Sequence, residues 1–284
     1  MPKSEKAKLV GESQNMFNNK IIIGTVMILF FILFSVFGTL IGPSSDLSQD
    51  YDLSLKPPSL EHPFGTDLLG RDMYIRAVQG GRISLLVGFL SIIVSLLVGL
   101  PLGAIAGYYG GWIDTLIMRS ADIFLSMPTI LGALLIMALI GPGLINILIV
   151  FSMLGWAYIA RLFRSNVISI KNSDFILSAR GLGASGPRII FRHIAPNSVG
   201  PVLLFALMNI GTAILAESVL SFLGVGLQPP VVSWGYLLSE SVTRYMVAPW
   251  LMYFPGALLT LTVIGFTLIG EGVSFVFDPK ERYE

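Results

Sequence analysis

The sequence predicts an all-α polytopic membrane protein with six transmembrane helices, and three observations support that prediction. The chain has 284 residues, of which 54% are hydrophobic and 12% charged, whereas soluble domains carry about a quarter charged residues. Its mean hydropathy is +0.79. Several uncharged runs reach the roughly 20 residues that a helix needs to cross a hydrocarbon core about 30 Å thick. A water-facing surface could not cover this much apolar material.

The uncharged runs place each helix in turn. The first run covers residues 21–42, and the second covers 83–113. The run over 123–160 is too long for one span, and the Gly-Pro-Gly sequence at 141–143 divides it into two helices. The last two spans lie within 199–227 and 245–270. We expect the six helices to end near residues 42, 109, 140, 162, 225 and 272.

Charge assigns the connecting segments to two sides of the membrane. Residues 1–20 carry four lysines, and 161–192 carries six basic residues against Asp174 alone. Residues 43–81 carry three basic residues against six acids, and 228–244 carries one charge of each sign. Because cytoplasmic loops are enriched in Lys and Arg, both basic segments and both termini are expected in the cytoplasm. The chain is expected to begin with a cytoplasmic tail over 1–20, a first transmembrane helix over 21–42 and an extracytoplasmic loop over 43–81. A core of five transmembrane helices follows over 82–275 and contains a cytoplasmic loop at 163–197. A cytoplasmic tail over 276–284 comes last.

Composition also argues against several functions. A net charge of +1 gives no electrostatic reason to expect a nucleic-acid partner. The chain has no cysteine and only two histidines, His62 and His193, which argues against a disulfide framework, a Cys nucleophile or a metal site. The polar N-terminus lacks a small-residue cleavage site after its apolar run, so that run is expected to be a retained anchor. No catalytic residue is predicted.

The segment 178–198, SARGLGASGPRIIFRHIAPNS, is basic and lies between two apolar runs. A short helix is expected over 174–180, with Gly181 and Gly183 loosening its end. A second helix is expected over 188–194, because Ser and Gly before it can cap it, proline is tolerated in its first turn, and a further proline ends it at position 196. The pattern predicts a helix–turn–helix elbow on the cytoplasmic face.

The second helix of this elbow has two distinct faces. Ile190 and Ile194 share one face, with Phe191 beside them, and Arg188 and Arg192 share another. Three interpretations are open from these residues alone: charges that only fix topology while the helix lies on lipid headgroups, a site for an anionic lipid, or a docking elbow for a soluble partner protein. The docking elbow explains why a defined double-helix shape is present, since scattered lysines would be enough for topology.

The elbow resembles the EAA loop of permeases from binding-protein-dependent ABC importers. In that loop Glu-Ala-Ala is followed by a Gly four residues after the second Ala, then by nine residues and Ile-x-Leu-Pro. Here Leu177-Ser178-Ala179 stands at Glu-Ala-Ala, Gly183 at the Gly, and His193-Ile194-Ala195-Pro196 at the end. The Gly and the Pro fall at the right spacing, whereas Leu177, His193 and Ala195 depart from the pattern.

The resemblance covers nearly the whole chain and is closest to the C-type subunit of dipeptide, oligopeptide and nickel permeases. The matching motifs are HPFGTDLLGRD at 62–72, GYYGG at 107–111, RHIAPN at 192–197, LSFLGVGLQPP at 220–230 followed by SWG at 233–235, and DPK at 278–280. Together these motifs are specific, although no single one would be.

The resemblance implies a type I ABC importer permease fold in a prokaryotic inner membrane. It implies four partners besides the lipid bilayer: a homologous second permease subunit, two cytoplasmic ATPase subunits and an extracytoplasmic substrate-binding protein. The chain has no GxxxxGK[ST] loop to cradle phosphate, so ATP and Mg²⁺ are expected in the ATPase subunits and no cofactor in this chain.

The resemblance also implies that the elbow is a coupling helix that sits in a cleft of one ATPase. Closure of the ATPase pair on ATP would then tilt the bundle from inward- to outward-facing. Arg188 and Arg192 would give charge complementarity, and the apolar side chains beside them would fill the cleft. The expected coupling residues are Ala179, Gly183, Arg188, Ile190, Phe191, Arg192, His193, Ile194 and Pro196.

Two further groups of residues are candidates. Glu217 is the one ionisable group deep within a span, where a charge facing lipid costs at least about 2.5 kcal/mol. It is either a packed, hydrogen-bonded structural residue or a translocation-pathway residue near the subunit interface. Asp67, Arg71 and Asp72 belong either to an ion network beneath the docked binding protein or to a plain solvated loop. His62 is expected to be a turn residue.

The expected function is that of a non-catalytic permease subunit of an ATP-driven importer. Peptides are the commonest substrates of such permeases, and nickel or metal chelates, opines and oligosaccharides stay open because the binding protein selects the substrate. A stand-alone channel or secondary transporter would need membrane charges arranged in a relay, and a membrane enzyme would need clustered His, Asp or Glu. One deep Glu is too few for either.

Overall fold

The computed structural model describes the backbone over residues 3–42 and 49–277, and the side chains over 17–42 and 49–274. Two compact units make up the chain. Unit 1 comprises Met1–Phe89, Met137–Ile147 and Ile210–Glu284, and unit 2 comprises Leu90–Ile136 and Leu148–Asn209. Most of the predicted tail over 276–284, with its DPK motif, lies outside the described residues.

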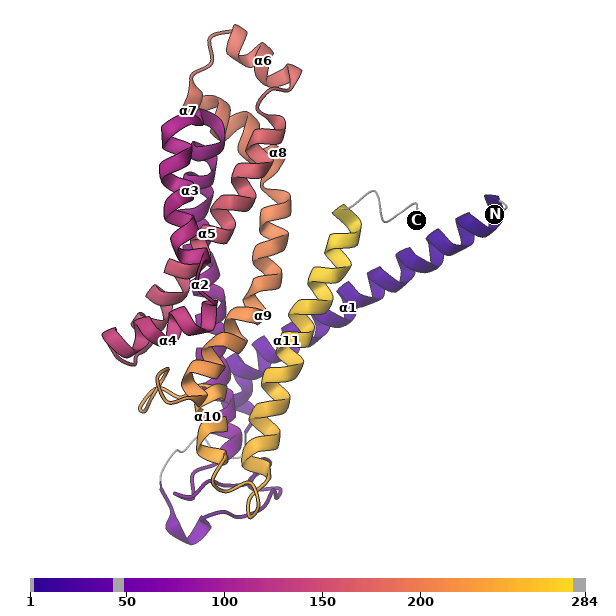
Figure 1. Cartoon of the computed structure of the whole chain (residues 1–284). Helices are drawn as coiled ribbons and strands as arrows, with labels where there is room; N and C mark the ends of the chain where they lie inside the picture. Colours follow the sequence, from indigo (N-terminus) through magenta and orange to yellow (C-terminus); the bar gives the residue numbers. More distant parts are fainter. Residues whose placement is uncertain (1–2, 43–48, 278–284) are drawn as a thin grey trace. The chain divides into compact units, whose positions relative to one another are not determined.

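The described residues are helical, as the composition predicts, and their one strand-like feature is an isolated bridge between Thr66 and Asp72. Figure 1 shows the helices in chain order. They are α1 (Lys3–Ile41), η1 (Tyr51–Leu53), α2 (Met73–Tyr109), α3 (Gly111–Leu125), α4 (Thr129–Ile140), α5 (Leu144–Ile170), α6 (Asp174–Gly181), α7 (Gly186–Ile189), η2 (Ile190–Ile194), α8 (Ala195–Ser198), α9 (Gly200–Phe222), α10 (Trp234–Ser241) and α11 (Trp250–Phe277).

Five helices are long and apolar enough to cross a membrane, namely α1 over Phe17–Ile41, α2, α5, α9 and α11 over Trp250–Ser274. The predicted third span is the exception, because it is not one helix. Helices α3 and α4 pass the same test only as a pair, bent by 86°. The break lies at residues 126–128, where Pro128 restricts the residue before it and cannot continue α3. Alone, the 12-residue α4 would reach only about 18 Å.

Two predicted helix ends were wrong for a common reason. Helix α5 was expected to end near residue 162 and continues to Ile170, and α11 was expected to end near 272 and continues to Phe277. The predictions placed each end where charges begin. Charges mark the border of the hydrocarbon core, whereas a helix continues into water as long as its backbone bonds and packing are maintained. The first eight residues of the predicted loop over 163–197 are therefore helical.

Within unit 2, α2 packs on α5 along a row of small residues spaced four apart. Ser95, Gly99, Gly103 and Gly107 lie on this row. A side chain at Gly103 would collide with the backbone of Ala160, and equivalent side chains at the other two glycines would collide with neighbouring α5 residues. Such close backbone approach is how helices associate in lipid, where hydrophobic force does not drive them together.

Within unit 1, α1 packs along α11 and α10 also packs on α11. The Lys20 ammonium on α1 lies 2.7 Å from the Glu271 carboxylate on α11. Trp234 at the start of α10 is fully buried, and its indole N–H donates to the Ala77 carbonyl of α2 at 2.8 Å. These contacts fix the position of α10, which carries part of the charged cluster described below.

Candidate functional sites

The first half of the elbow is α6, which ends in the glycine turn that the sequence predicts. Gly183 has a φ of +82°, in the left-handed region that other residues adopt only with strain. Its N–H donates to the Arg180 carbonyl, and the N–H of Ala184 donates to the Ala179 carbonyl at 3.1 Å. Ala179 thus takes part in closing the turn. Gly181 is the last residue of α6 and needs no special conformation.

The second half of the elbow is longer than predicted, because the helix does not stop at Pro196. Helices α7, η2 and α8 follow one another from Gly186 to Ser198 without a gap. The η2 segment is a π-helical turn in which the Ala195 N–H donates to the Ile190 carbonyl. A wider turn accommodates the missing N–H and the ring of Pro196, which would disrupt an ordinary α-helical turn.

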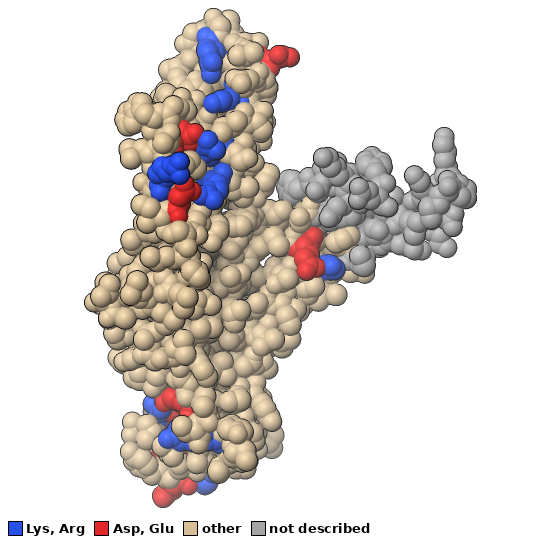
Figure 2. All heavy atoms as spheres, viewed as in Figure 1, with Lys and Arg blue, Asp and Glu red and all other residues tan. Residues whose placement is uncertain are grey.

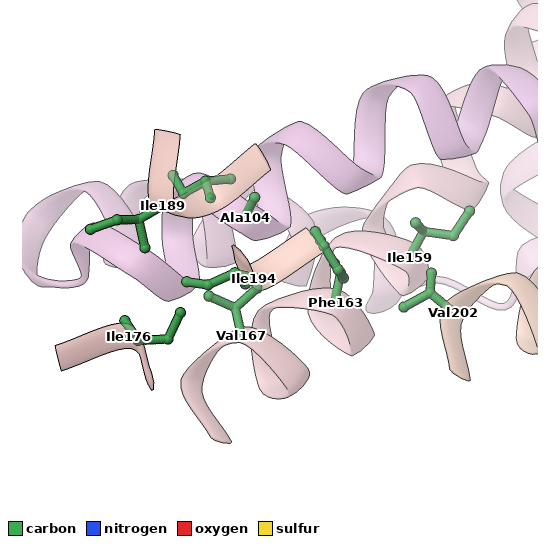
Figure 3. Packing of buried hydrophobic residues seen from close by; sticks show 9 residues of the cluster. Ala104, Ile159, Phe163, Val167, Ile176, Ile189, Ile194 and Val202 are labelled. Atoms are coloured by element: carbon green, nitrogen blue, oxygen red, sulfur yellow. The ribbon is translucent and has the colours of Figure 1, made fainter. Parts of the chain in front are cut away.

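The predicted apolar ridge of the elbow faces inward, which corrects the expectation that Ile190 and Ile194 fill an ATPase cleft. Ile194 is fully buried and Ile190 is 6% exposed. Together with Ile189 they pack into a core cluster with residues of α2 and α5, including Phe163 and Val167 (Figure 3). Helical periodicity grouped these residues correctly, but it could not distinguish an inward face from a docking face.

The outer face of the elbow is formed by Phe191, Arg188 and Arg192. The Phe191 side chain is 75% exposed, and both arginines are exposed without an ion-pair partner in the described part of the chain. Leu182 in the turn is 89% exposed. His193 is half-buried and Pro196 exposed. Figure 2 shows Lys and Arg gathered at the end of unit 2 that carries the elbow.

The GYYGG motif at 107–111 forms the seat of the elbow, which the sequence did not predict. Gly186 lies against the rings of Tyr108 and Tyr109, and the Arg180 guanidinium lies 5.7 Å from the centre of the Tyr108 ring. The Lys171 ammonium donates to the Gly107 carbonyl at 3.0 Å. The signal that could have indicated this role is the pair of tyrosines at the end of a predicted span, because each offers a large ring for packing and a polar hydroxyl.

Helix α3 is bound to α5 by ion pairs in the same unit. Arg164 donates through two nitrogens to the Asp114 carboxylate, and Arg161 donates to Asp122. The sequence-based count treated both arginines as loop charges, whereas they lie on the last turns of α5. A bidentate pair of this kind fixes the geometry more closely than a single contact does, so α3 is held firmly against α5, from which the chain continues into the elbow.

In unit 1, an ion network includes two of the three residues predicted for the loop over 43–81. The Asp67 carboxylate accepts from Arg71 Nε at 2.7 Å and from Arg76 Nη1 at 2.6 Å, and Arg76 Nη2 donates to Glu240 on α10 at 2.6 Å. Arg76 is 3% exposed and Asp67 5%. Burial, and then the Glu240 carboxylate, raise the pKa of the Tyr236 phenol that bonds to Glu240. The sequence missed Arg76 and Glu240 because they are distant from each other in the chain.

Asp72 lies outside this network. Its Oδ1 accepts from the N–H groups of Tyr74 and Ile75 and so caps the start of α2. Its Oδ2 lies 2.8 Å from Nδ1 of His62, which is therefore more than the turn residue expected. Asp72 is only 3% exposed. Like Asp67, it offers no carboxylate surface to a docked protein.

Glu217 is fully buried on α9, and hydroxyl groups surround its carboxylate. Ser221 donates to Oε1 at 2.6 Å, and Ser84 and Ser218 donate to Oε2 at 3.2 and 3.4 Å. The Ser84 oxygen also accepts from the backbone N–H of Trp234, and the Ser221 oxygen accepts from the backbone N–H of Leu227. Through these two serines, Glu217 is linked to the middle of the segment between α9 and α10 and to the first residue of α10. This geometry fits the packed structural alternative and places the carboxylate out of contact with solvent.

In the part of the chain with described side chains, no three His, Asp or Glu residues gather closely enough to hold a metal ion. The elbow and the loop network both consist of packing and charge contacts, without a nucleophile–base pair.

Comparison with known proteins identifies the family. Residues 99–283 match the family described as binding-protein-dependent transport system inner membrane component. The chain is 45% identical over 265 residues to the dipeptide transport system permease protein of Alkalihalophilus pseudofirmus, covering 93% of this chain and 87% of that protein. It is 36% identical to the oligopeptide transport system permease protein of Bacillus subtilis over the same length, with the same coverage.

A solved structure shares the fold. The crystal structure of an amino acid ABC transporter with histidines contains a chain that matches with a TM-score of 0.51 and 16% identity, covering 72% of this chain and 94% of that one. Family, helices and fold thus agree with the expectations from the sequence. The chain is a multi-pass inner-membrane protein and belongs to the family of permease components of binding-protein-dependent ABC importers.

Proposed function

We propose that this chain is the non-catalytic permease subunit of an ATP-driven peptide importer and that the outer face of its elbow docks on an ATPase subunit. The observation that carries the proposal is the exposed Phe191 side chain between two exposed arginines. A large aromatic anchor flanked by cations is a typical hot-spot arrangement at protein interfaces. The named functions of the relatives, dipeptide and oligopeptide transport, support peptides as the substrate class.

The elbow can transmit movement because its inner side is packed and its outer side is free. Ile189 and Ile194 fix it to α2 and α5, and Tyr108 contacts the start of its second half at Gly186. When ATP closes the pair of ATPase subunits, a push on Phe191 would move the helices with the elbow instead of deforming it. Packed interfaces of this type switch between discrete arrangements, so a small shift at one site becomes a larger movement of the helices.

The proposed complex contains a second homologous permease subunit, two cytoplasmic ATPases that bind ATP and Mg²⁺, and an extracytoplasmic substrate-binding protein. Both termini and the elbow lie in the cytoplasm in this proposal, because the positive-inside rule places the basic segments there. The binding protein selects the peptide, so a ligand screen on that protein identifies the substrate.

The test is Phe191→Asp in the assembled importer, purified in detergent. A carboxylate pressed into an apolar cleft without a partner costs several kcal/mol. We expect normal abundance of the permease, reduced co-purification of the ATPases and loss of substrate-stimulated ATP hydrolysis.

The matched control is Leu60→Asp, which makes the same kind of change at a side chain that is 97% exposed in the loop of unit 1. It should leave ATPase co-purification unchanged. Full retention of the ATPases by Phe191→Asp would rule out the docking role and favour a helix that lies on lipid headgroups.

A further inference from the structure

Helix α3 packs along the second half of α5 in unit 2 and lies between the elbow and the break before α4. Helix α5 continues to Ile170, just before α6 begins the elbow, and α3 ends at Leu125, directly before the break at 126–128. The two helices share a core in which the rings of Phe124 and Trp156 meet edge-on, with their centres 5.7 Å apart. The buried residues of this core are Ala121, Trp156, Ala157 and Ala160. A movement of the elbow that carries α5 along can therefore reach the break through this contact.

Two ion pairs flank the core between α3 and α5, and they differ in strength. Asp114 accepts from Arg164 through two hydrogen bonds, both 2.5 Å long, and these side chains are 18% and 31% exposed. Asp122 accepts from Arg161 through a single contact, and these side chains are 45% and 50% exposed. Solvent weakens an ion pair as its exposure increases, and a bidentate pair fixes the geometry of both partners. The pair at Asp114 is therefore the tighter of the two connections.

The Asp122 carboxylate has a second arginine within reach. Nη1 of Arg119, one turn earlier on α3, lies 3.6 Å from Oδ2 of Asp122, while Oδ1 accepts from Arg161. A separation of 3.6 Å is too long for a hydrogen bond. The Arg119 side chain is 79% exposed and has no other ion-pair partner among the described residues. Asp122 thus lies between two guanidinium groups, one that moves with it on α3 and one on α5.

This arrangement gives the two aspartates different responses when α3 and α5 move apart. Asp114 has only Arg164 as an ion-pair partner in the described part of the chain, so separation would leave a largely buried carboxylate without a countercharge. Asp122 would lose Arg161 and can close the remaining gap to Arg119 instead. Arg161 is exposed enough for water to solvate it after the exchange. The connection at Asp114 is therefore fixed, whereas the one at Asp122 is exchangeable.

We propose that Asp122 exchanges Arg161 for Arg119 during the transport cycle. Helix α3 then pivots about its connection at Asp114 and moves the break before α4. Asp122 and Arg119 are positioning residues in this mechanism, because they act through the position of α3. The inference rests on the proposed function, in which ATP binding moves the elbow and α5 with it. A contact with two discrete arrangements turns a small shift into a switch.

The first experiment measures distances between pairs of nitroxide spin labels in the complete importer, reconstituted in nanodiscs with cysteine-free partner subunits. Labels at Ile123→Cys and Tyr158→Cys report on the exchangeable connection, and labels at Thr115→Cys and Ser165→Cys report on the fixed one. All four positions are exposed, and the chain has no cysteine of its own. The 123–158 distance should change between the nucleotide-free state and the state trapped with ATP and vanadate. The 115–165 distance should stay constant.

The second experiment measures peptide uptake by the importer in proteoliposomes. Arg119→Gln removes only the alternative partner and leaves the contact between Asp122 and Arg161 in place. Uptake and peptide-stimulated ATP hydrolysis should both fall about threefold, the effect of losing one exposed ion pair in the exchanged arrangement. The melting temperature and the co-purification of the ATPases should stay at wild-type values. The matched control is Arg119→Lys, which keeps the charge and should retain most of the uptake rate.

Two results would overturn the exchange. One is a 123–158 distance that stays constant or changes only as much as the 115–165 distance. The other is wild-type uptake in Arg119→Gln, or an equal loss of uptake in Arg119→Gln and Arg119→Lys. A purely static role of Arg119 predicts this second result, because its guanidinium is too far from Asp122 to form a hydrogen bond.

Failure of the proposed function has a different signature. In that case the wild-type importer itself would show no ATP-dependent peptide uptake. If the wild type transports peptide and Arg119→Gln transports it equally well, only the exchange at Asp122 is wrong.

Discussion

The elbow in unit 2 and the charged cluster in unit 1 use similar residues for opposite purposes. On the elbow, Arg188 and Arg192 are exposed and have no ion-pair partner in the described chain. In the cluster, Arg76 is 3% exposed and holds two carboxylates. A charge in a predicted loop can therefore face outward or serve as an internal tie, and burial distinguishes the two. Arg244 stands between these cases, since it is half-buried, donates to the Glu240 carbonyl and has no ion-pair partner among the described residues.

The largest effect should come from breaking the internal tie. Arg76→Ala removes the shared donor of Asp67 and Glu240 and leaves both carboxylates undercompensated in a site where the Arg76 side chain is 4% exposed. Loss of one partner from a buried pair costs about 3–5 kcal/mol. We expect reduced abundance in membranes and a lower melting temperature of the detergent-purified protein. The control is Arg71→Ala, whose side chain is 22% exposed and whose loss should destabilise the protein less. An equal loss of stability in the two variants would contradict the expectation that the more buried arginine matters more.

The second prediction tests whether Glu217 is structural. Glu217→Ala removes the acceptor of three buried hydroxyls, and unsatisfied buried polar groups cost about 1–3 kcal/mol. Thermal unfolding should show this loss, and Glu217→Gln, which keeps a carbonyl acceptor, should show less of it. Wild-type stability of Glu217→Ala together with lost transport would instead support a role in the translocation pathway.

The third prediction concerns the turn of the elbow. Gly183→Ala forces a Cβ into a φ of +82°, which costs about 1–2 kcal/mol. We expect a small decrease in melting temperature and weaker ATPase association, because the turn sets the angle of the outer face. Gly181→Ala is the matched control: it lies inside α6, has open space around it and should be neutral or slightly stabilising. Equal behaviour of the two variants would mean that the turn conformation is unimportant.

The prediction with the smallest expected effect on the protein tests on which side of the membrane each segment lies. Ser59→Cys and Ser185→Cys place single thiols at exposed positions of the unit 1 loop and the elbow, in a chain without other cysteines. Neither change should affect stability measurably, since exposed substitutions usually have little effect. An impermeant maleimide added from outside should label Ser59→Cys and should label Ser185→Cys only after the membrane is opened. Labelling of both from outside would contradict the proposed topology.

The elbow shows how far local reasoning extends. Glycine, proline and helical spacing predicted its two helices, the turn at Gly183 and the grouping of Ile190 with Ile194. The same reasoning ended the second helix at Pro196, because it considered only the α-helical turn and not the π-helical one that the chain adopts. The direction of the isoleucines depended on Phe163 and Val167, which no local pattern identifies.

The sequence by itself determined the membrane class, the apolar segments, the family that the chain resembles and the existence of a charged elbow. These properties depend on composition, on run length and on motifs that are contiguous in the chain, and each can be evaluated within a short window. Only the tertiary structure decided which charges are internal. Arg76 meets Glu240 across 164 residues and Trp234 meets Ala77 across 157. Burial and ion pairing are properties of such distant contacts, so the surroundings of Asp67, Glu217 and Arg244 could be known only after the chain had folded around them.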